Sequence, residues 1–200
     1  MDHFLRIALP IYFVLYFGIA FVAKSIIVAK RIGKNPLVLP KDDSAYGLLG
    51  RYFKITMGLL FIYIILFGLV SDPQEFFIPL GLFNDSLSTN LGLILLAFSL
   101  IWTIVAQHHM KESWRIGIDR ESKTELITTG LFGYSRNPIF LGLMLSMAGL
   151  LLVTPNVMTL IFYIVSYILI QIQIRLEEEF LEGVYGQEYL NYKAMVRRFL

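Results

Sequence analysis

The fold is decided by residues 139–174, which read IFLGLMLSMAGLLLVTPNVMTLIFYIVSYILIQIQI. Two apolar runs, 139–153 and 157–174, flank the triplet Thr154-Pro155-Asn156. Proline beside asparagine and threonine is a turn signal, because proline does not continue a preceding helix. Apolar runs that approach about 20 residues are typical of helices that cross a bilayer. We therefore predict a tight antiparallel hairpin of two membrane helices.

The first run of this hairpin is unusually short. A helix of about 15 residues spans only roughly 22 Å, because each residue contributes about 1.5 Å. The hydrocarbon core of a bilayer is about 30 Å thick. We expect this helix to begin or end inside the protein and not at a lipid headgroup.

Three more apolar segments precede the hairpin, at residues 7–28, 52–70 and 90–106. The chain of 200 residues is 56% hydrophobic and 16% charged, whereas soluble domains are about 45–50% apolar and about 25% charged. A soluble fold of this size would expose large apolar patches. The first segment is longer than the apolar part of a secretory signal, so we expect a retained helix. The sequence predicts an all-α polytopic integral membrane bundle with about five transmembrane helices.

Basic residues predict the orientation, because cytoplasmic loops are enriched in Lys and Arg. Of the 17 basic residues, all but Arg6 fall in alternate connections: after the first segment, after the third, and in the C-terminal tail. We predict that the N-terminus lies outside and the C-terminus in the cytoplasm, at the cell membrane if the protein is prokaryotic. A net charge of +2 gives no reason to expect nucleic acid as a partner.

The tail, residues 175–200, carries apolar residues at helical spacing. They recur every three or four positions, which is typical of an amphipathic helix on a membrane or over a bundle. Gly186 interrupts the pattern and predicts a break into two pieces. The apolar positions are Phe180, Val184, Tyr185, Tyr189, Tyr192 and Val196.

Residues 130–142, GLFGYSRNPIFLG, open the fourth apolar segment. Pro138 suits the first turn of a helix and Asn137 suits its N-cap, so the stretch is explained as a helix start. The free amides of such a start, with Arg136 beside them, also suit a carboxylate or phosphate. Gly142, one turn further on, allows close approach of a ligand or another helix.

Charged residues follow the last apolar run directly, in the sequence RLEEE at 175–179. Such residues at the edge of the hydrocarbon usually face a polar cavity or a partner, although a fully solvated charge run is the simpler interpretation. Three consecutive glutamates cover most of a helix circumference, so at least one points at the bundle. His108 and His109 are adjacent and point to different sides, so we expect no metal site.

Three motifs occur in order: SWRIGID at 113–119, ELITTGLFGYSRNPIFLG at 125–142, and RLEEEFL at 175–181 with YGQEYLNY at 185–192. Together they resemble the isoprenylcysteine carboxyl methyltransferase family, and more closely its prokaryotic members. The resemblance covers roughly residues 105–198 and implies a membrane methyltransferase that uses S-adenosylmethionine and a lipophilic or prenylated acceptor. It divides the chain into N-terminal helices, residues 1–89, and a catalytic region, residues 90–200.

The resemblance also implies the site. A family glutamate that contacts the cofactor falls on Glu177, with Glu178 next to it. A family arginine near it, which holds the acceptor carboxylate, falls on Gln173, and the nearest arginine is Arg175. We expect Arg175 and Glu178 to be the catalytic residues. The family usually has His at the position of Asn137, and Tyr at those of Phe132 and Phe140. With Arg136 added from the helix start, the expected cofactor-binding residues are Thr124, Glu125, Leu126, Ile127, Phe132, Arg136, Asn137, Pro138, Ile139, Phe140 and Glu177.

The chemistry of these residues suits S-adenosylmethionine. Arg136 suits its carboxylate, Glu177 or Glu178 its ammonium, and the aromatic side chains its adenine. Two alternatives stay open. The Arg-Asn-Pro turn before a hairpin is also similar to membrane sterol and steroid reductases that use NADPH, although the acidic run suits an ammonium better than a phosphate. A non-enzymatic membrane scaffold is the other alternative.

Overall fold

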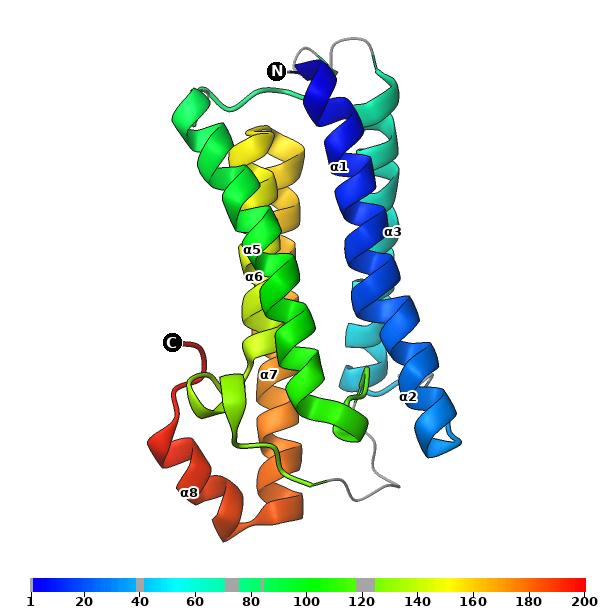
Figure 1. Ribbon diagram of the computed structural model, residues 1–200, viewed down its shortest axis with the longest axis vertical. Helices are drawn as coiled ribbons and strands as arrows, with labels where there is room; N and C mark the ends of the chain where they lie inside the picture. The colour runs from blue at the N-terminus through cyan, green and yellow to red at the C-terminus, as the bar shows by residue number, and fades with distance from the viewer. Residues whose placement is uncertain (1, 39–41, 71–75, 84, 118–124) are drawn as a thin grey trace.

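The computed structural model describes residues 2–38, 42–70, 76–83, 85–117 and 125–200. Within these ranges the chain is helical, with only two isolated backbone bridges, and the helices form one elongated bundle (Figure 1). The elements are α1 (Asp2–Phe17), the π-helix η1 (Gly18–Ala23), α2 (Lys24–Ile32), α3 (Ala45–Leu69), α5 (Ser86–Met110), the 3-10 helices η2 (Lys111–Ser113) and η3 (Gly130–Gly133), α6 (Pro138–Val153), α7 (Val157–Tyr185) and α8 (Gln187–Met195).

Four helical rods are long and apolar enough to cross a membrane: His3–Ile32, Ala45–Leu69, Ser86–Ser113 and Val157–Tyr185. Helix α6 is a fifth, shorter apolar helix. Side chains from α1, α3, α5, α6 and α7 form one apolar core, while many large apolar side chains on the outer faces stay exposed. An apolar exterior is what a bilayer requires, so the predicted all-α membrane bundle is confirmed.

The hairpin of α6 and α7 is present at the predicted turn. Asn156 caps α7, because its side chain accepts from Thr159 N at 3.0 Å while Thr159 Oγ1 accepts from Asn156 N at 3.2 Å. Asn156 Nδ2 also donates to Tyr63 Oη at 2.8 Å. This buried cap joins the turn to α3 and fixes where the hairpin reverses.

Helix α6 begins inside the protein, as its length predicts. It has 16 residues, or about 24 Å, and its first turn starts well short of the far end of α7 (Figure 1). Asn137 and Pro138 are both buried at this start. The space below α6 is filled by η3, α8 and the lower part of α7.

Glycines let α5 and α6 approach closely. A Cβ added at Gly142 would lie 2.2 Å from Thr103 Oγ1, and one at Gly149 would lie 2.9 Å from Gly92 O. Small residues at a helix contact allow this approach in membranes. Gly142 therefore accommodates another helix, α5, and not a ligand.

We expect Gly142→Ala to destabilise the protein by about 1–3 kcal/mol, because the new methyl group overlaps the buried side chain of Thr103, whose Oγ1 is hydrogen-bonded to Tyr16. Thermal unfolding in detergent measures this. Gly58→Ala is the matched control, because no atom lies within 4 Å of a Cβ added there. Equal melting temperatures for the two variants would contradict the assignment.

A row of polar contacts joins the first rod to α5. Tyr12 Oη lies 2.9 Å from both Ser99 Oγ and Ser146 Oγ, and Tyr16 Oη lies 2.8 Å from Thr103 Oγ1. The residues in each helix are four apart, so one face of α1 meets one face of α5. Buried hydroxyls that satisfy one another hold the two helices in register without exposing polar groups to lipid.

The π-helix extends this row. Lys24 N bonds to Ile19 O, five residues back, which leaves Ala20 O free to accept from Gln107 Nε2 at 2.7 Å. Lys24 Nζ in turn donates to Gln107 O at 2.8 Å, near the end of α5. The helical irregularity therefore has a local cause, since it provides an acceptor for a buried amide.

The helix formed by the last apolar run extends beyond its hydrophobic residues. Helix α7 does not end near Ile174 but runs on to Tyr185, so the RLEEE sequence lies on the same helix as the apolar run. Gly186 has a φ of 55° and separates α7 from α8. The predicted break at Gly186 is confirmed, whereas its first piece is part of α7 and not of a separate tail helix.

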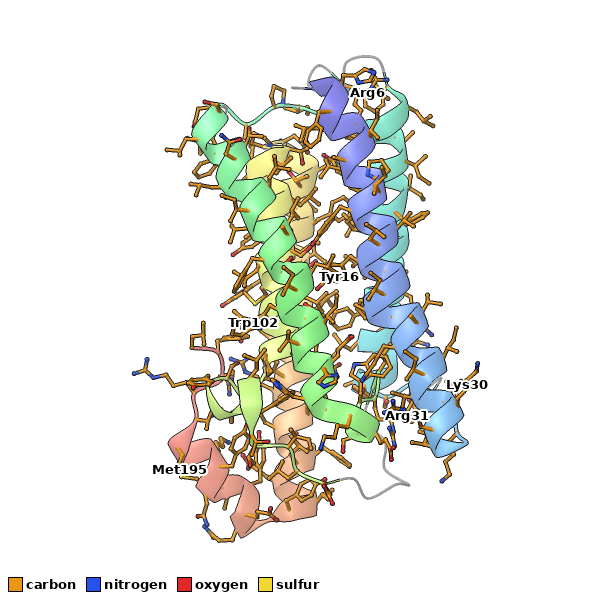
Figure 2. All side chains as sticks on the ribbon, in the orientation of Figure 1. Arg6, Tyr16, Lys30, Arg31, Trp102 and Met195 are labelled. Atoms are coloured by element: carbon orange, nitrogen blue, oxygen red, sulfur yellow. The ribbon has the colours of Figure 1, made fainter. Side chains whose placement is uncertain are left out.

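We call the end of the bundle that holds Lys30, Arg31 and Met195 the basic end; Arg6 lies at the opposite end (Figure 2). The ends of α2, α5 and α7 and the start of α3 meet at the basic end, together with α8 (Figure 1). The segregation of charge along the bundle agrees with the alternation of basic connections in the sequence. Which end faces the cytoplasm stays a prediction.

Candidate functional site

A cavity of about 170 Å³ lies at the basic end. Its walls come from the end of α5 with the residues after it, the loop before η3, the start of α6, the lower part of α7, and α8. The lining residues are Met110, Ser113, Arg115, Gly117, Glu125, Leu126, Ile127, Phe132, Arg136, Asn137, Glu177, Glu178, Phe180, Leu181, Tyr185, Tyr189 and Tyr192.

The structure brings most of the expected site residues to this cavity. Those that line it are Glu125, Leu126, Ile127, Phe132, Arg136, Asn137, Glu177 and Glu178. They come from three separate stretches of sequence and meet because the α6–α7 hairpin places residues 125–137 beside the lower part of α7. Their assignment to a cofactor stays a prediction.

Four of the other expected residues lie elsewhere. Pro138, Ile139 and Phe140 are in the first turn of α6 but do not line the cavity, and Pro138 O accepts instead from Trp102 Nε1 at 2.8 Å. Arg175 is exposed, and its Nη1 donates to Gln171 O at 2.7 Å and Gln171 Oε1 at 2.9 Å on its own helix. Thr124 lies outside the described residues.

An ion cluster forms one wall of the cavity. Arg136 Nη2 donates to Glu178 Oε1 at 2.8 Å, and Arg198 donates to the same carboxylate through Nε at 3.1 Å and Nη2 at 2.6 Å. The Glu178 and Arg136 side chains are 7% and 8% exposed. A buried carboxylate keeps its charge only when cations and donors surround it, and both Glu178 oxygens have them.

The backbone around Asn137 is held by this cluster and by the tail. Asn137 is the N-cap residue of α6, but its side chain makes no capping bond; Asn137 Nδ2 donates to Arg198 O at 3.2 Å instead. Asn137 therefore occupies the predicted N-cap position, but its side chain bonds to the backbone of Arg198 and does not cap the helix. Ser135 Oγ accepts from Asn137 N at 3.2 Å.

Glu177 also lines the cavity, but its hydrogen-bond partner is an amide, whereas Glu178 is bonded to arginines. Glu177 Oε1 accepts from Gln173 Nε2 at 2.6 Å, and Gln173 Nε2 lies 3.3 Å from Tyr46 Oη at the start of α3. Among the described residues, no cationic side chain forms an ion pair with Glu177. The cavity therefore offers one carboxyl group bonded to an amide and one carboxylate paired with two arginines.

Two tyrosines from α8 complete the wall. Tyr192 Oη donates to Phe132 O at 2.7 Å, which fixes η3 against α8. Burial, together with the negative charge of Glu178, raises the pKa of Tyr189 to about 12, and burial also raises the pKa of Tyr192. Both phenols therefore stay neutral near pH 7 and present aromatic surface and hydroxyl groups.

The N-terminal region supports the cavity from behind. Val38 N donates to Ile116 O at 2.8 Å and Ile116 N donates to Pro36 O at 3.0 Å. Gly117 has a φ of 103°, and a Cβ there would lie 2.4 Å from Val38 O. The connection after α2 thus holds the segment that carries Ser113 and Gly117, a function that the sequence of the first two helices does not reveal.

His109 has a structural function. Its Nδ1 accepts from Leu131 N at 3.2 Å, and Gly130, with a φ of 65°, is in contact with its ring. The histidine thereby joins the end of α5 to η3. Across the ranges that the structure describes, no group of three or more His, Cys, Asp or Glu side chains is placed to hold a metal ion.

Fold and site together define a class: an integral membrane helical bundle with a charged and aromatic cavity where a membrane hairpin begins. Residues 87–188 match the phospholipid methyltransferase (PEMT) family, and the chain belongs to this family. The resemblance in sequence to the related isoprenylcysteine methyltransferases is likewise confirmed.

Among known proteins, the chain is similar to a protein-S-isoprenylcysteine O-methyltransferase of Saccharomyces cerevisiae, with 30% identity over 131 residues. The matched part is 62% of this chain and 55% of the yeast protein, so the chain spans about half the length of that relative. No solved structure matches.

Proposed function

We propose that the protein is a membrane methyltransferase that uses S-adenosylmethionine to methylate a lipophilic acceptor. The family and the yeast relative support methyl transfer in a membrane. The observation that carries the cofactor assignment is that the cavity wall has both a basic cluster and an acidic group that pairs with no cation among the described residues. Arg136, Glu178 and Arg198 together have one excess positive charge, while Glu177 presents a carboxyl group bonded to Gln173, which a cofactor ammonium would hold in its ionised form.

An amino-acid group carries an ammonium and a carboxylate, so it suits a cavity wall that has both an acidic group and a basic cluster. In this proposal Glu177 binds the ammonium, and the arginine cluster faces the carboxylate. Phe132 and the α8 tyrosines provide surfaces for the adenine, since aromatic rings stack on such bases. The chemistry of the lining residues therefore fits the cofactor.

The cavity is small for a nucleoside cofactor. Its volume of about 170 Å³ is below the roughly 300–1,000 Å³ of typical small-molecule pockets. Binding of a nucleoside cofactor requires the cavity to widen. Residues 125–128 have no regular secondary structure, so displacement of this loop breaks no helix and is the change we propose.

When bound, the cofactor supplies a methyl group on a positively charged sulfur. Transfer to an acceptor oxygen or other nucleophile would be an in-line displacement with S-adenosylhomocysteine as the leaving group, and such a reaction would need little acid–base help from the protein. The protein contributes mainly position and exclusion of water. Glu177 and the arginine cluster fix the ends of the amino-acid group, and Tyr189 and Tyr192 close the cavity on the side of α8.

The acceptor belongs to the same proposal. The yeast relative's name indicates the carboxylate of a prenylated cysteine, and a lipophilic chain would enter sideways from the bilayer. Gln173 is neutral, and the exposed Arg175 lies outside the cavity, so we do not propose that either holds the acceptor carboxylate by charge. We further propose that the basic end faces the cytoplasm.

Transfer of a labelled methyl group tests the activity. Membranes that contain the protein, S-adenosylmethionine labelled in its methyl group, and a farnesylated cysteine derivative should yield label that partitions with lipid. Release of the label by mild base as methanol would identify a carboxyl ester. Label in lipid that resists base would replace the carboxylate by another acceptor group, and no incorporation above membranes without the protein would count against methyl transfer to these acceptors.

A further inference from the structure

Residues 193–198, which are the last turn of α8 and the residues directly after it, return to the start of α6. Arg136 N donates to Arg197 O at 2.9 Å. Ser135 Oγ donates to Arg198 O at 3.4 Å, close to the bond from Asn137 Nδ2 to the same atom. These bonds fix the backbone of this segment against Ser135, Arg136 and Asn137, the three residues directly before α6.

Side chains make the same connection. Arg136 Nη1 donates to Lys193 O at 3.1 Å and also to Val196 O. Arg198 crosses in the other direction to the Glu178 carboxylate on α7. Arg136 is thus held by α7 on one side and by the tail on the other, and Glu178 is the group that both arginines share.

The contact of Arg198 with Glu178 is specific in geometry. Its Nε and Nη2 donate to different oxygens of one carboxylate, which is the two-pronged arrangement that a planar guanidinium favours. The Arg198 side chain is 33% exposed while that of Glu178 is only 7% exposed. Hydrogen bonding to Glu178 raises the pKa of Arg198, so the pair stays ionised in the physiological range.

We propose that Arg198 is a positioning residue for the cavity: acting through Glu178, it holds Arg136 and residues 193–198 against the start of α6. Arg136 and Glu178 line the cavity and Arg198 does not. An effect of Arg198 on cofactor binding is therefore indirect, and it rests on the proposed function. Without Arg198, Glu178 keeps only one of its three hydrogen bonds, and Arg136 can turn toward it and leave the carbonyls of Lys193 and Val196. The wall of the cavity then loses its fixed shape.

Arg197 provides a matched control. It is adjacent and has the same charge, but its side chain is exposed and only its backbone oxygen contacts Arg136. Arg197→Ala removes one positive charge from the same segment and leaves the Glu178 contact intact. A general effect of charge or of tail sequence would therefore appear in both variants.

The first experiment is a double-mutant cycle on purified protein in lipid nanodiscs, with S-adenosylhomocysteine as the titrated ligand. We expect Arg198→Ala to raise the Kd about tenfold, the range seen when a charged hydrogen bond is lost, and Arg198→Lys to raise it less. Arg197→Ala should leave the Kd unchanged. In a Glu178→Gln background, Arg198→Ala should have little further effect, because the two residues act as a unit.

The proposal is overturned if Arg198→Ala weakens binding equally in both backgrounds, or if Arg197→Ala has the same effect. A second measurement does not depend on the cofactor. Hydrogen exchange of peptides that cover residues 134–140 should be faster in Arg198→Ala than in wild type and unchanged in Arg197→Ala. Unchanged exchange in both variants would also overturn the proposal.

The two measurements separate the failure of this inference from the failure of the proposed function. If wild-type protein does not bind S-adenosylhomocysteine, the proposed function fails, while hydrogen exchange still decides whether Arg198 fixes the start of α6. If the ligand binds and neither readout responds to Arg198→Ala, the inference fails and the proposed function stands.

Discussion

Arg136→Ala is expected to lower the free energy of unfolding by about 3–5 kcal/mol, the usual cost of leaving a buried ion pair without one partner. The variant should also lose binding of S-adenosylhomocysteine. Arg136 joins α7 to the tail, since it donates to Glu178 and to the carbonyls of Lys193 and Val196. Unfolding in detergent measures the stability, and calorimetry the binding.

Arg51→Ala is the control for this prediction. It removes the same charge from an exposed pair with Asp43, and exposed pairs contribute little to stability. We expect no measurable change in melting temperature or affinity. Comparable stability of the Arg136 and Arg51 variants would show that the ion cluster does not hold the basic end together.

Glu177→Gln is expected to weaken binding of S-adenosylhomocysteine by about 10- to 100-fold, which corresponds to the loss of one charge-assisted hydrogen bond. The fold should be unaffected, because a glutamine oxygen can still accept from Gln173 Nε2. Calorimetric titration reports the affinity, and an unchanged melting temperature shows that the variant is folded.

Glu179→Gln is the matched control, since Glu179 is exposed and lies outside the cavity. It changes the net charge of α7 by the same amount, two residues away. If both variants bind as wild type does, Glu177 does not hold the ammonium. If both weaken binding equally, the effect is one of overall charge and not of position.

The parts of the fold that sequence predicts are those set by local patterns. The turn at Thr154-Pro155-Asn156, the shortness of the fourth apolar run and the break at Gly186 each depend on residues close in the chain. The extent of α7 was harder to place, because hydropathy falls at Arg175 while helix propensity does not. A helix that leaves the hydrocarbon has no reason to end there when the next residues, Leu176 to Leu181, also favour a helix.

The candidate site includes residues that local sequence patterns predict and one residue that they do not predict. Family motifs gather Glu125, Phe132, Arg136 and Glu177 at one cavity, because each lies within a recognisable stretch. Arg198 was missed, since a lone arginine near the end of the sequence is indistinguishable from Arg197 without the fold. Only the return of the tail to α6 brings it to Glu178, 20 positions away.

The pattern of the tail predicts an apolar face but leaves open what that face covers. Tyr189 and Tyr192 recur at helical spacing, and the pattern indicated an apolar face on a membrane or over the bundle. In the structure both side chains are buried against η3 and α7, so they form part of the cavity wall. Spacing predicts which residues share a face but not what that face covers.

In our proposal the cavity at the basic end binds S-adenosylmethionine. Calorimetric titration of the wild-type protein in nanodiscs with S-adenosylhomocysteine, and separately with NADPH, tests it most directly. We predict saturable binding of S-adenosylhomocysteine that is lost in Arg136→Ala, and no binding of NADPH. Binding of NADPH alone would support a reductase and contradict the claim, and binding of neither ligand would favour a membrane scaffold.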